Sequence, residues 1–237
     1  MVLKPAHPAV TEGRTIFPSR VVDVKDSPRL FISGMNNRKI GRKVVKGEWA
    51  GMPIYTLTLE ERATCPTYCP TWATCYGNGM HWPRRHRHGP ELEMGIRLEL
   101  RDLAEKHPLG FVVRLHVLGD FYSQNYVGVW IKLLADHDAL HIFGYTARAG
   151  DDIAEAVVNM NKIFPDRCAI RFSGTEIKPG AAVVVMSDVP QPGAFICPAE
   201  TSKTECCSTC GLCWAEAARD KAVLFILHGN PGRGGAI

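Results

Sequence analysis

The alternation of apolar strands with amphipathic helices constrains the fold of this chain more than any other feature. Between residues 54 and 172, short apolar stretches bounded by polar turns alternate with segments of helical period. The expected strands are Ile54–Leu59, Phe111–Leu118, Ala139–Tyr145 and Cys168–Phe172, and the expected helices are Glu91–Lys106, Tyr126–Ala135 and Asp151–Ile163. Strands joined through helices pair in parallel by right-handed crossovers.

Further apolar stretches extend this pattern toward the C-terminus. Strands are expected at Ala182–Met186, Ala194–Cys197 and Val223–Leu227, with a helical turn over Trp214–Lys221 and a Gly-rich tail after the last strand. Together, these strands predict an α/β protein with a complete or partial (β/α) barrel of parallel strands. In such a barrel, functional residues lie on the loops that follow the carboxyl ends of the strands.

The first 50 residues have no sustained period, and their Pro, Gly, Arg and Lys content predicts an irregular basic arm over residues 1–50. Residues 51–237 are then expected to form the barrel-like domain. The N-terminus lacks the apolar stretch of a signal peptide, and the longest apolar runs are far shorter than the roughly 20 residues that cross a bilayer. We therefore expect a cytoplasmic protein without a membrane partner.

Nine cysteines, most of them in two groups, carry the clearest functional signal. Clustered cysteines in a reducing compartment bind metal more often than they pair with one another. The first group, Cys65-x3-Cys69-x5-Cys75, supplies three thiolates, one fewer than a closed zinc or cluster site uses. A [4Fe–4S] cluster held there would leave one iron free. The alternative is a zinc ion whose fourth ligand is one of the following: His81, His86, His88 or a distant cysteine.

The second group contains enough thiolates to close a site by itself. Its expected ligands are Cys197, Cys207, Cys210 and Cys213, whose tandem Cys-x2-Cys spacing suits both a second [4Fe–4S] cluster and a zinc ion. Such a centre would be structural or would transfer electrons. Cys206 could replace Cys207 as a ligand. Cys168 lies within an apolar strand and is expected to be an ordinary buried thiol.

Polar residues also follow two of the expected strands, where a parallel-sheet enzyme holds its ligand. Gly119 and Asp120 follow the second strand, and Arg148 follows the third. Asp120 and Arg148 are therefore candidate catalytic residues, and an arginine there can clamp a carboxylate or phosphate. The alternatives are a turn or helix-cap role for Asp120 and a surface ion pair for Arg148. His116, inside a strand, is expected to be a core histidine.

The formal net charge of +4 is unevenly distributed. The stretch from His81 to His88 mixes aromatic and basic side chains, as a nucleic-acid contact does. Other basic residues gather nearby in sequence: Arg38, Lys39, Arg42, Lys43 and Lys46. These tracts indicate a nucleic acid or nucleotide as partner, and a solvated basic surface is the alternative.

Several motifs together resemble the phage gene-product-88 family from about Asn36 onward. They are Leu57-Thr-Leu-Glu-Glu-Arg-Ala-Thr-Cys65-Pro, Cys75-Tyr-Gly-Asn78, Leu115-His-Val-Leu-Gly-Asp-Phe-Tyr-Ser123, Phe143-Gly-Tyr-Thr-Ala-Arg148 and Cys210-Gly-Leu-Cys-Trp214. The resemblance implies a phage-encoded protein in the host cytoplasm and no particular activity.

More remotely, the three-cysteine loop and the Gly119-Asp120 element are similar to those of radical S-adenosylmethionine enzymes. That resemblance implies S-adenosylmethionine as a cofactor, bound by Gly119, Asp120, Arg148 and Tyr76. The last cysteine interval is longer here than the usual Cys-x3-Cys-x2-Cys. The leading interpretation is a radical-type iron–sulfur enzyme acting on a nucleic acid or nucleotide. The alternative is a non-catalytic zinc or iron–sulfur protein that binds nucleic acid or a host factor.

Overall fold

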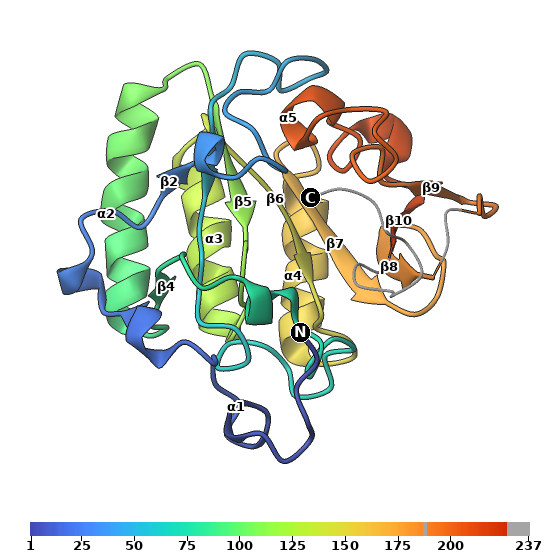
Figure 1. Cartoon of the computed structure of the whole chain (residues 1–237). Coiled ribbons are helices and arrows are strands. Elements are labelled where there is room, and N and C mark those ends of the chain that lie inside the picture. The colour runs from blue at the N-terminus through green and yellow to red at the C-terminus, as the bar shows by residue number, and fades with distance from the viewer. Residues whose placement is uncertain (187–188, 227–237) are drawn as a thin grey trace.

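The computed structural model describes residues 1–186 and 189–226 and shows an α/β protein with a mostly parallel sheet (Figure 1). Its eight strands are β2 (Ile32–Ser33), β3 (Ile54–Thr56), β5 (Phe111–Leu115), β6 (Leu140–Thr146), β7 (Cys168–Gly174), β8 (Ala181–Val185), β10 (Ala222–Ile226) and β9 (Ala194–Ile196), in spatial order. Every neighbouring pair is parallel except β2 with β3. A separate parallel pair joins β1 (Val21–Val22) to β4 (Arg85–His86).

From β3 to β8 the order of the strands in the sheet follows their order in the chain. Successive crossovers therefore step across the sheet in one direction, as they do in a (β/α) barrel. Among the described residues, no pairing joins β2 to β9 and closes the sheet.

Three helices lie side by side on one face of the sheet (Figure 1): α2 (Pro90–Lys106), α3 (Gln124–Asp136) and α4 (Asp152–Ile163). The side chains of Ser123 and Asp151 accept hydrogen bonds from the backbone N–H groups of Tyr126 and Ala154, which caps the starts of α3 and α4. Figure 1 also labels two shorter helices, α1 (Pro8–Thr11) and α5 (Cys207–Cys210).

The main core lies between these helices and the sheet. On α2, Leu92, Ile96 and Leu100 recur every four residues and are wholly buried. They meet Phe111 and Leu115, which point to the same face of β5 because side chains alternate along a strand. Burying each of these side chains contributes roughly 1.5–3 kcal/mol. This core fixes the strands, and thereby the loops at their carboxyl ends.

The other face of the sheet packs against two segments that are far apart in the sequence. Trp49 and Trp214 stack with ring centroids 5.3 Å apart and planes inclined by 4°. Both are buried, and Trp214 rests on Phe143 of β6. The indole of Trp49 also donates to the backbone carbonyl of Asp166 at 2.9 Å. The segment that carries the second cysteine group is thus anchored on the face opposite the helices.

Residues 1–50 contribute to both cores. Their short elements are α1, β1, β2 and the 3-10 helices Pro18–Arg20, Val24–Asp26 and Gly34–Asn36. Leu30 and Phe31 belong to the core under the helices, and Ile40 and Val44 to the core on the opposite face. This segment is irregular, as predicted, but it is integral to the fold.

The predicted alternation of strands and helices is confirmed, with shifted ends. The predicted strand Phe111–Leu118 is wrong beyond Leu115. There the backbone of Val117 and Leu118 forms hydrogen bonds with Leu57 and Leu59, outside the regular pairing of the sheet. The stretch Gly77–Pro90, predicted as loop, contains β4 and the end of a 3-10 helix, Tyr76–Gly79. The predicted turn Trp214–Lys221 is helical only over Glu216–Ala218. Residue 227 and the predicted Gly-rich tail lie outside the described residues.

No helix in residues 1–186 and 189–226 combines the length and the apolar character that a membrane span requires.

Candidate metal centre

The first cysteine loop follows β3 and rests on buried charged groups. Arg85 of β4 donates through Nε to Glu61 at 2.6 Å, and both side chains are buried. Arg62 donates to the backbone carbonyls of Arg14 and Trp72. Buried charges are costly unless they are paired or hydrogen-bonded; Arg85 and Glu61 form an ion pair, and Arg62 is satisfied by hydrogen bonds. They fix both the start of the loop and its middle.

Cys65, Cys69 and Cys75, which we call the first thiol group, are free and partly buried. Burial raises the pKa of Cys75 to about 11. Burial also raises the pKa of Cys65, and the carboxylate of Asp120 and the other two thiols add to this effect. Cys65 and Cys75 are therefore neutral at pH 7, and a metal that binds them must displace their protons.

Asp120 joins three segments at the carboxyl edge of the sheet. Its Oδ1 accepts hydrogen bonds from Phe121 N and Thr146 Oγ1, and its Oδ2 accepts one from Ala147 N, all at 2.7 Å. Its backbone N–H donates to Thr64 Oγ1 at 3.1 Å. Burial raises the pKa of Asp120 to about 6 although these hydrogen bonds lower it. Because protein donors occupy its carboxylate, the geometry supports a positioning role for this predicted catalytic residue.

Gly119 allows a close approach between β5 and the first cysteine loop. Its φ of +83° favours glycine, and a Cβ placed there would lie 2.6 Å from Leu59 Cβ and from Thr64 Oγ1. The lack of a side chain is therefore required by packing against the protein itself. This requirement explains Gly119 without a bound ligand.

Arg148 reaches the same loop from the end of β6. Its Nε donates to the carbonyl of Phe121 at 2.7 Å, and its Nη2 donates to the carbonyl of Thr64 at 3.0 Å. Its Nη1 lies 3.6 Å from the carboxylate of Asp151. Arg148 thus holds the residue before Cys65 in place, and it also makes the surface ion pair that was the alternative interpretation.

Tyr76, predicted to bind a cofactor, begins the 3-10 helix that follows Cys75 and is 60% exposed. Its phenol lies within electrostatic range of Arg114, Cys65 and Cys75. Burial of the hydroxyl raises the pKa of Tyr76, so only part of the ring faces solvent.

The second thiol group consists of Cys197, Cys207, Cys210 and Cys213, all free and partly buried. Cys197 follows β9, and the others lie on α5 and just after it. Burial, with the charges of the other three cysteines, raises the pKa of Cys207 to about 12, and the charge of Arg114 opposes this shift. The four thiols therefore lie within electrostatic range of one another.

Cys206 is separate from this group. Its Sγ lies 3.1 Å from Ser208 Oγ, and it forms a capping box with Thr209 at the start of α5. Although burial opposes the change, hydrogen bonds from Ser208 and Thr209 lower the pKa of Cys206. Of the two neighbouring cysteines, it is therefore Cys207 that lies with Cys197, Cys210 and Cys213.

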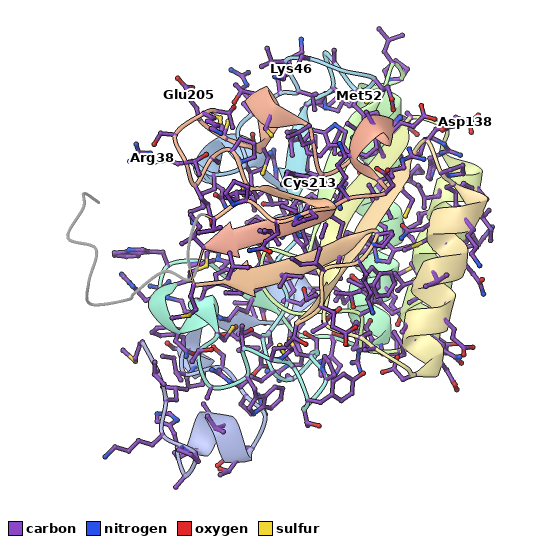
Figure 2. All side chains as sticks on the ribbon, turned by 90° about the vertical axis from the view of Figure 1, so that its right-hand side faces the viewer. Arg38, Lys46, Met52, Asp138, Glu205 and Cys213 are labelled. Carbon is purple, nitrogen blue, oxygen red and sulfur yellow. The ribbon has the colours of Figure 1, made fainter. Side chains whose placement is uncertain are left out.

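Arg171 of β7 fixes the segment that carries the second thiol group. It is 3% exposed and donates to the backbone carbonyls of Cys213, Lys221 and Ala218 at 3.0, 2.7 and 2.8 Å. Figure 2 shows Cys213 on the side of the strands away from the helices. The hydroxyl of Tyr145, on β6, lies 3.0 Å from Cys213 Sγ.

Arg114 of β5 lies beside the second thiol group, on the face of the sheet opposite the helices. Its charge acts on Cys207 and Cys213 and also on Tyr76, next to the first group. Its guanidinium carbon lies 4.7 Å from the ring centroid of Tyr145. Sequence reasoning missed Arg114 and Tyr145. The sequence signal that could have pointed to Arg114 is its position as the one charged residue of the otherwise apolar strand β5.

As the side chains stand, no three His, Cys, Asp or Glu residues in the described part of the chain are grouped as ligands of one metal ion. The histidines proposed as a fourth zinc ligand have other neighbours. His86 is buried in β4, His88 packs against Tyr122, and His81 against Trp82. The donors available are thus the three thiols of the first group and the four of the second, and that they bind metal stays a prediction. Both suit a cluster, whose thiolates bind different iron atoms.

A cleft of about 550 Å³ opens beside the first thiol group. Cys65, Thr67 and Trp72 form part of its wall, and the ion pair between Arg14 and Glu60, 2.7 Å long, forms another part. A small molecule in this cleft would reach the Cys65 side of the group.

A family model described as "Gene product 88" matches residues 30–216, which include both thiol groups and every strand from β2 to β9 in chain order. No curated protein and no solved structure matches the chain.

Proposed function

The chain belongs to the gene product 88 family, and we propose that it is an iron–sulfur protein whose first thiol group holds a [4Fe–4S] cluster with one iron left free. The observation that carries this proposal is the donor count. Three free thiols of one loop, Cys65, Cys69 and Cys75, lie within electrostatic range of one another at the carboxyl edge of a parallel sheet. Three thiolates leave one corner of a cubane for another ligand.

We further propose that the protein is a radical-type enzyme that uses S-adenosylmethionine. A bound cluster of this kind, once reduced by an external electron donor, would supply the electron for reductive cleavage of the sulfonium of S-adenosylmethionine. The strand order from β3 to β8 supports this proposal, because the loops after β3, β5 and β6 then lie beside one another at one edge. The cleft beside Cys65 offers room for a small cofactor.

In this proposal, Asp120 and Arg148 act as positioning residues. Asp120 ties the end of β5 to the end of β6, and Arg148 holds the carbonyl of Thr64, immediately before Cys65. A cluster ligand held by such contacts is oriented before the metal binds. Tyr76, exposed beside Cys75, is the side chain we assign to the cofactor itself.

The second thiol group would hold an auxiliary centre. Its four thiolates complete the coordination of a cubane or of zinc, so this centre is structural or transfers electrons. Trp214 follows Cys213 and is buried against Trp49, which shields this side from water.

Protein purified without oxygen tests the proposal in two steps. Broad visible absorption with iron and sulfide in equal amounts supports the clusters, whereas colourless protein without iron contradicts them. The cluster-loaded protein is then reduced with dithionite in the presence of S-adenosylmethionine. Release of methionine supports the radical enzyme. If the loaded protein neither binds nor cleaves S-adenosylmethionine, the radical enzyme is refuted and the protein is an iron–sulfur protein of another kind.

One observation favours a second candidate function, a non-catalytic nucleic-acid-binding protein with zinc or iron–sulfur centres. Trp82 is 75% exposed, and the guanidinium of Arg20 lies 5.9 Å from the centroid of its ring. An exposed ring beside arginine is a stacking platform for single-stranded bases. Arg38 and Lys46 project outward from the N-terminal segment (Figure 2).

Trp82→Ala distinguishes this candidate. Base stacking contributes roughly 1–3 kcal/mol per base, so the variant should bind oligothymidine at least five-fold more weakly in a fluorescence titration. Trp72→Phe, at a partly buried tryptophan, is the matched control. Stoichiometric zinc in colourless protein, together with this loss, would favour the binding protein over the enzyme.

A further inference from the structure

We propose that Arg114 anchors a binding site for an oxyanion, a carboxylate or phosphate group of a small molecule, on the face of the sheet opposite the helices. The site lies beside the second thiol group and within electrostatic range of Tyr76, which follows Cys75 of the first. The anion would bind to Arg114 and to neither set of cysteines, so the proposal does not require that a cluster be present.

The first argument is the charge on Arg114. Among the described residues, no carboxylate lies within salt-bridge distance of its guanidinium. In Arg171, also on this face of the sheet, each of the three guanidinium nitrogens donates to a backbone carbonyl. A partly buried cation without a counter-charge is costly, and a bound anion would remove that cost.

The second argument is the number of donors left over. A guanidinium has five N–H donors, and Arg114 uses one nitrogen, Nη1, to bond the carbonyl of Leu115. The other nitrogens have no protein acceptor among the described residues. Free donors in a planar fork fit the two oxygens of a carboxylate or phosphate.

The third argument is that the guanidinium is held in place. Its carbon lies 4.7 Å from the centroid of the Tyr145 ring and 5.6 Å from that of Phe143. Tyr145 is itself fixed by its contact with Cys213 Sγ and by the edge of Phe225, whose centroid is 5.4 Å away. Rings around the cation restrict its motion, so less entropy is lost when an anion binds.

The fourth argument concerns access. Arg114 and Tyr145 are partly exposed, whereas Val112 and Phe143 beneath them are buried. Tyr76 is 60% exposed, and its hydroxyl, whose pKa is raised by burial, lies within electrostatic range of Arg114. A ligand can therefore approach along the exposed part of Tyr76 and place its anionic group on Arg114.

A rival role for Arg114 is to offset negative charge on metal-bound Cys207 and Cys213. Arg114→Lys separates the two roles, because lysine keeps the charge but lacks the planar fork. Isothermal titration calorimetry with inorganic pyrophosphate and, separately, with succinate should give saturable binding of at least one anion to the wild-type protein. We expect Arg114→Lys to weaken that binding at least ten-fold. Arg101→Lys, on α2 at the opposite face, is the control and should bind as the wild type does.

The two titrations also identify the source of the anion, because pyrophosphate represents a phosphate-bearing ligand and succinate a carboxylic acid. Failure of both to bind the wild-type protein overturns the proposal, as does equal binding by Arg114→Lys. Iron content is measured on the same samples. Normal iron without anion binding refutes only this inference, whereas anion binding without iron refutes only the proposed cluster.

A second measurement does not depend on the folding of a variant. Phenylglyoxal modifies free guanidinium groups, and peptide mass analysis locates the modified arginines. Saturating anion should protect Arg114 in the wild-type protein and leave Arg101 reactive. Equal modification of Arg114 with and without the anion contradicts the proposed site.

Discussion

Replacing His116 with glutamine tests whether a buried neutral imidazole limits the stability of this protein in acid. His116 is 3% exposed, and its Nε2 lies 2.9 Å from the hydroxyl of Tyr126. Its ring lies edge-on to Phe121 with centroids 5.0 Å apart. Its Nδ1 has no hydrogen-bond partner among the described residues. Burial, and then the charge of Arg114, lower the pKa of His116 to about 3.

The sign of the effect follows from this pKa. The unfolded chain protonates His116 near pH 6.5, whereas the folded protein does so only near pH 3. The stability that depends on neutral His116 is therefore fully present above pH 6.5 and is lost as the pH falls. Each pH unit below 6.5 costs about 1.4 kcal/mol, so a change from pH 7 to pH 4.5 removes about 2.5 kcal/mol. Burial lowers the pKa of His86 to about 4, which adds a slope of the same sign.

The assay is urea unfolding of the wild type and of His116→Gln at pH 7 and pH 4.5. Glutamine retains a polar group near Tyr126 but loses ring contacts worth roughly 0.5–1.5 kcal/mol at both pH values. On acidification, the free energy of unfolding of the variant should fall by about 2.5 kcal/mol less than that of the wild type. His88→Gln, at an exposed position, should keep the wild-type slope. If wild type and His116→Gln lose stability in parallel, the reasoning is refuted.

Three further substitutions test the contacts around the thiol groups. Burial raises the pKa of Asp120 from 3.8 to about 6, so the wild type loses stability as the pH rises through that window. In urea unfolding, the free energy of unfolding of Asp120→Asn should therefore rise by about 2 kcal/mol relative to that of the wild type between pH 4.5 and pH 8. A difference that stays constant with pH would contradict this. Arg171→Met leaves three buried carbonyls without a donor and should cost about 3–5 kcal/mol, whereas Arg101→Met should cost less than about 0.5 kcal/mol by the same measurement. Gly119→Ala should cost about 1–3 kcal/mol, since its Cβ would overlap Leu59 and Thr64, and a wild-type melting temperature would show that the loop can move aside.

The order of strands and helices could be predicted from the sequence because it depends on local periodicity. Helix α2 is a clear case, since Leu92, Ile96 and Leu100 recur on one face and Pro108 ends the pattern. Strand β4 could not be predicted. It has two residues, and it forms because β1 and the bridge from Leu59 to His86 lie beside it. Such pairing depends on tertiary contacts that leave no period in the sequence.

The sequence pointed to the cysteines of the candidate site but not to its supporting contacts. Cysteine spacing predicts two thiol groups, because metal ligands often come from short loops, and their binding of metal stays a prediction. Spacing could not separate Cys206 from Cys207, since that difference lies in which side chain caps α5. The hydrogen bonds of Asp120 and the position of Arg114 depend on which strands are neighbours. Both emerge only when β5 and β6 are paired.

The central claim is that two separate sets of thiols each hold a metal centre, and metal analysis of three proteins tests it most directly. Iron, acid-labile sulfide and zinc are measured on protein made without oxygen: the wild type, Cys65→Ala/Cys69→Ala/Cys75→Ala and Cys207→Ala/Cys210→Ala/Cys213→Ala. We predict that each triple variant retains about half of the wild-type iron and sulfide. Wild-type protein without iron, or a triple variant with the full wild-type content, would contradict the account.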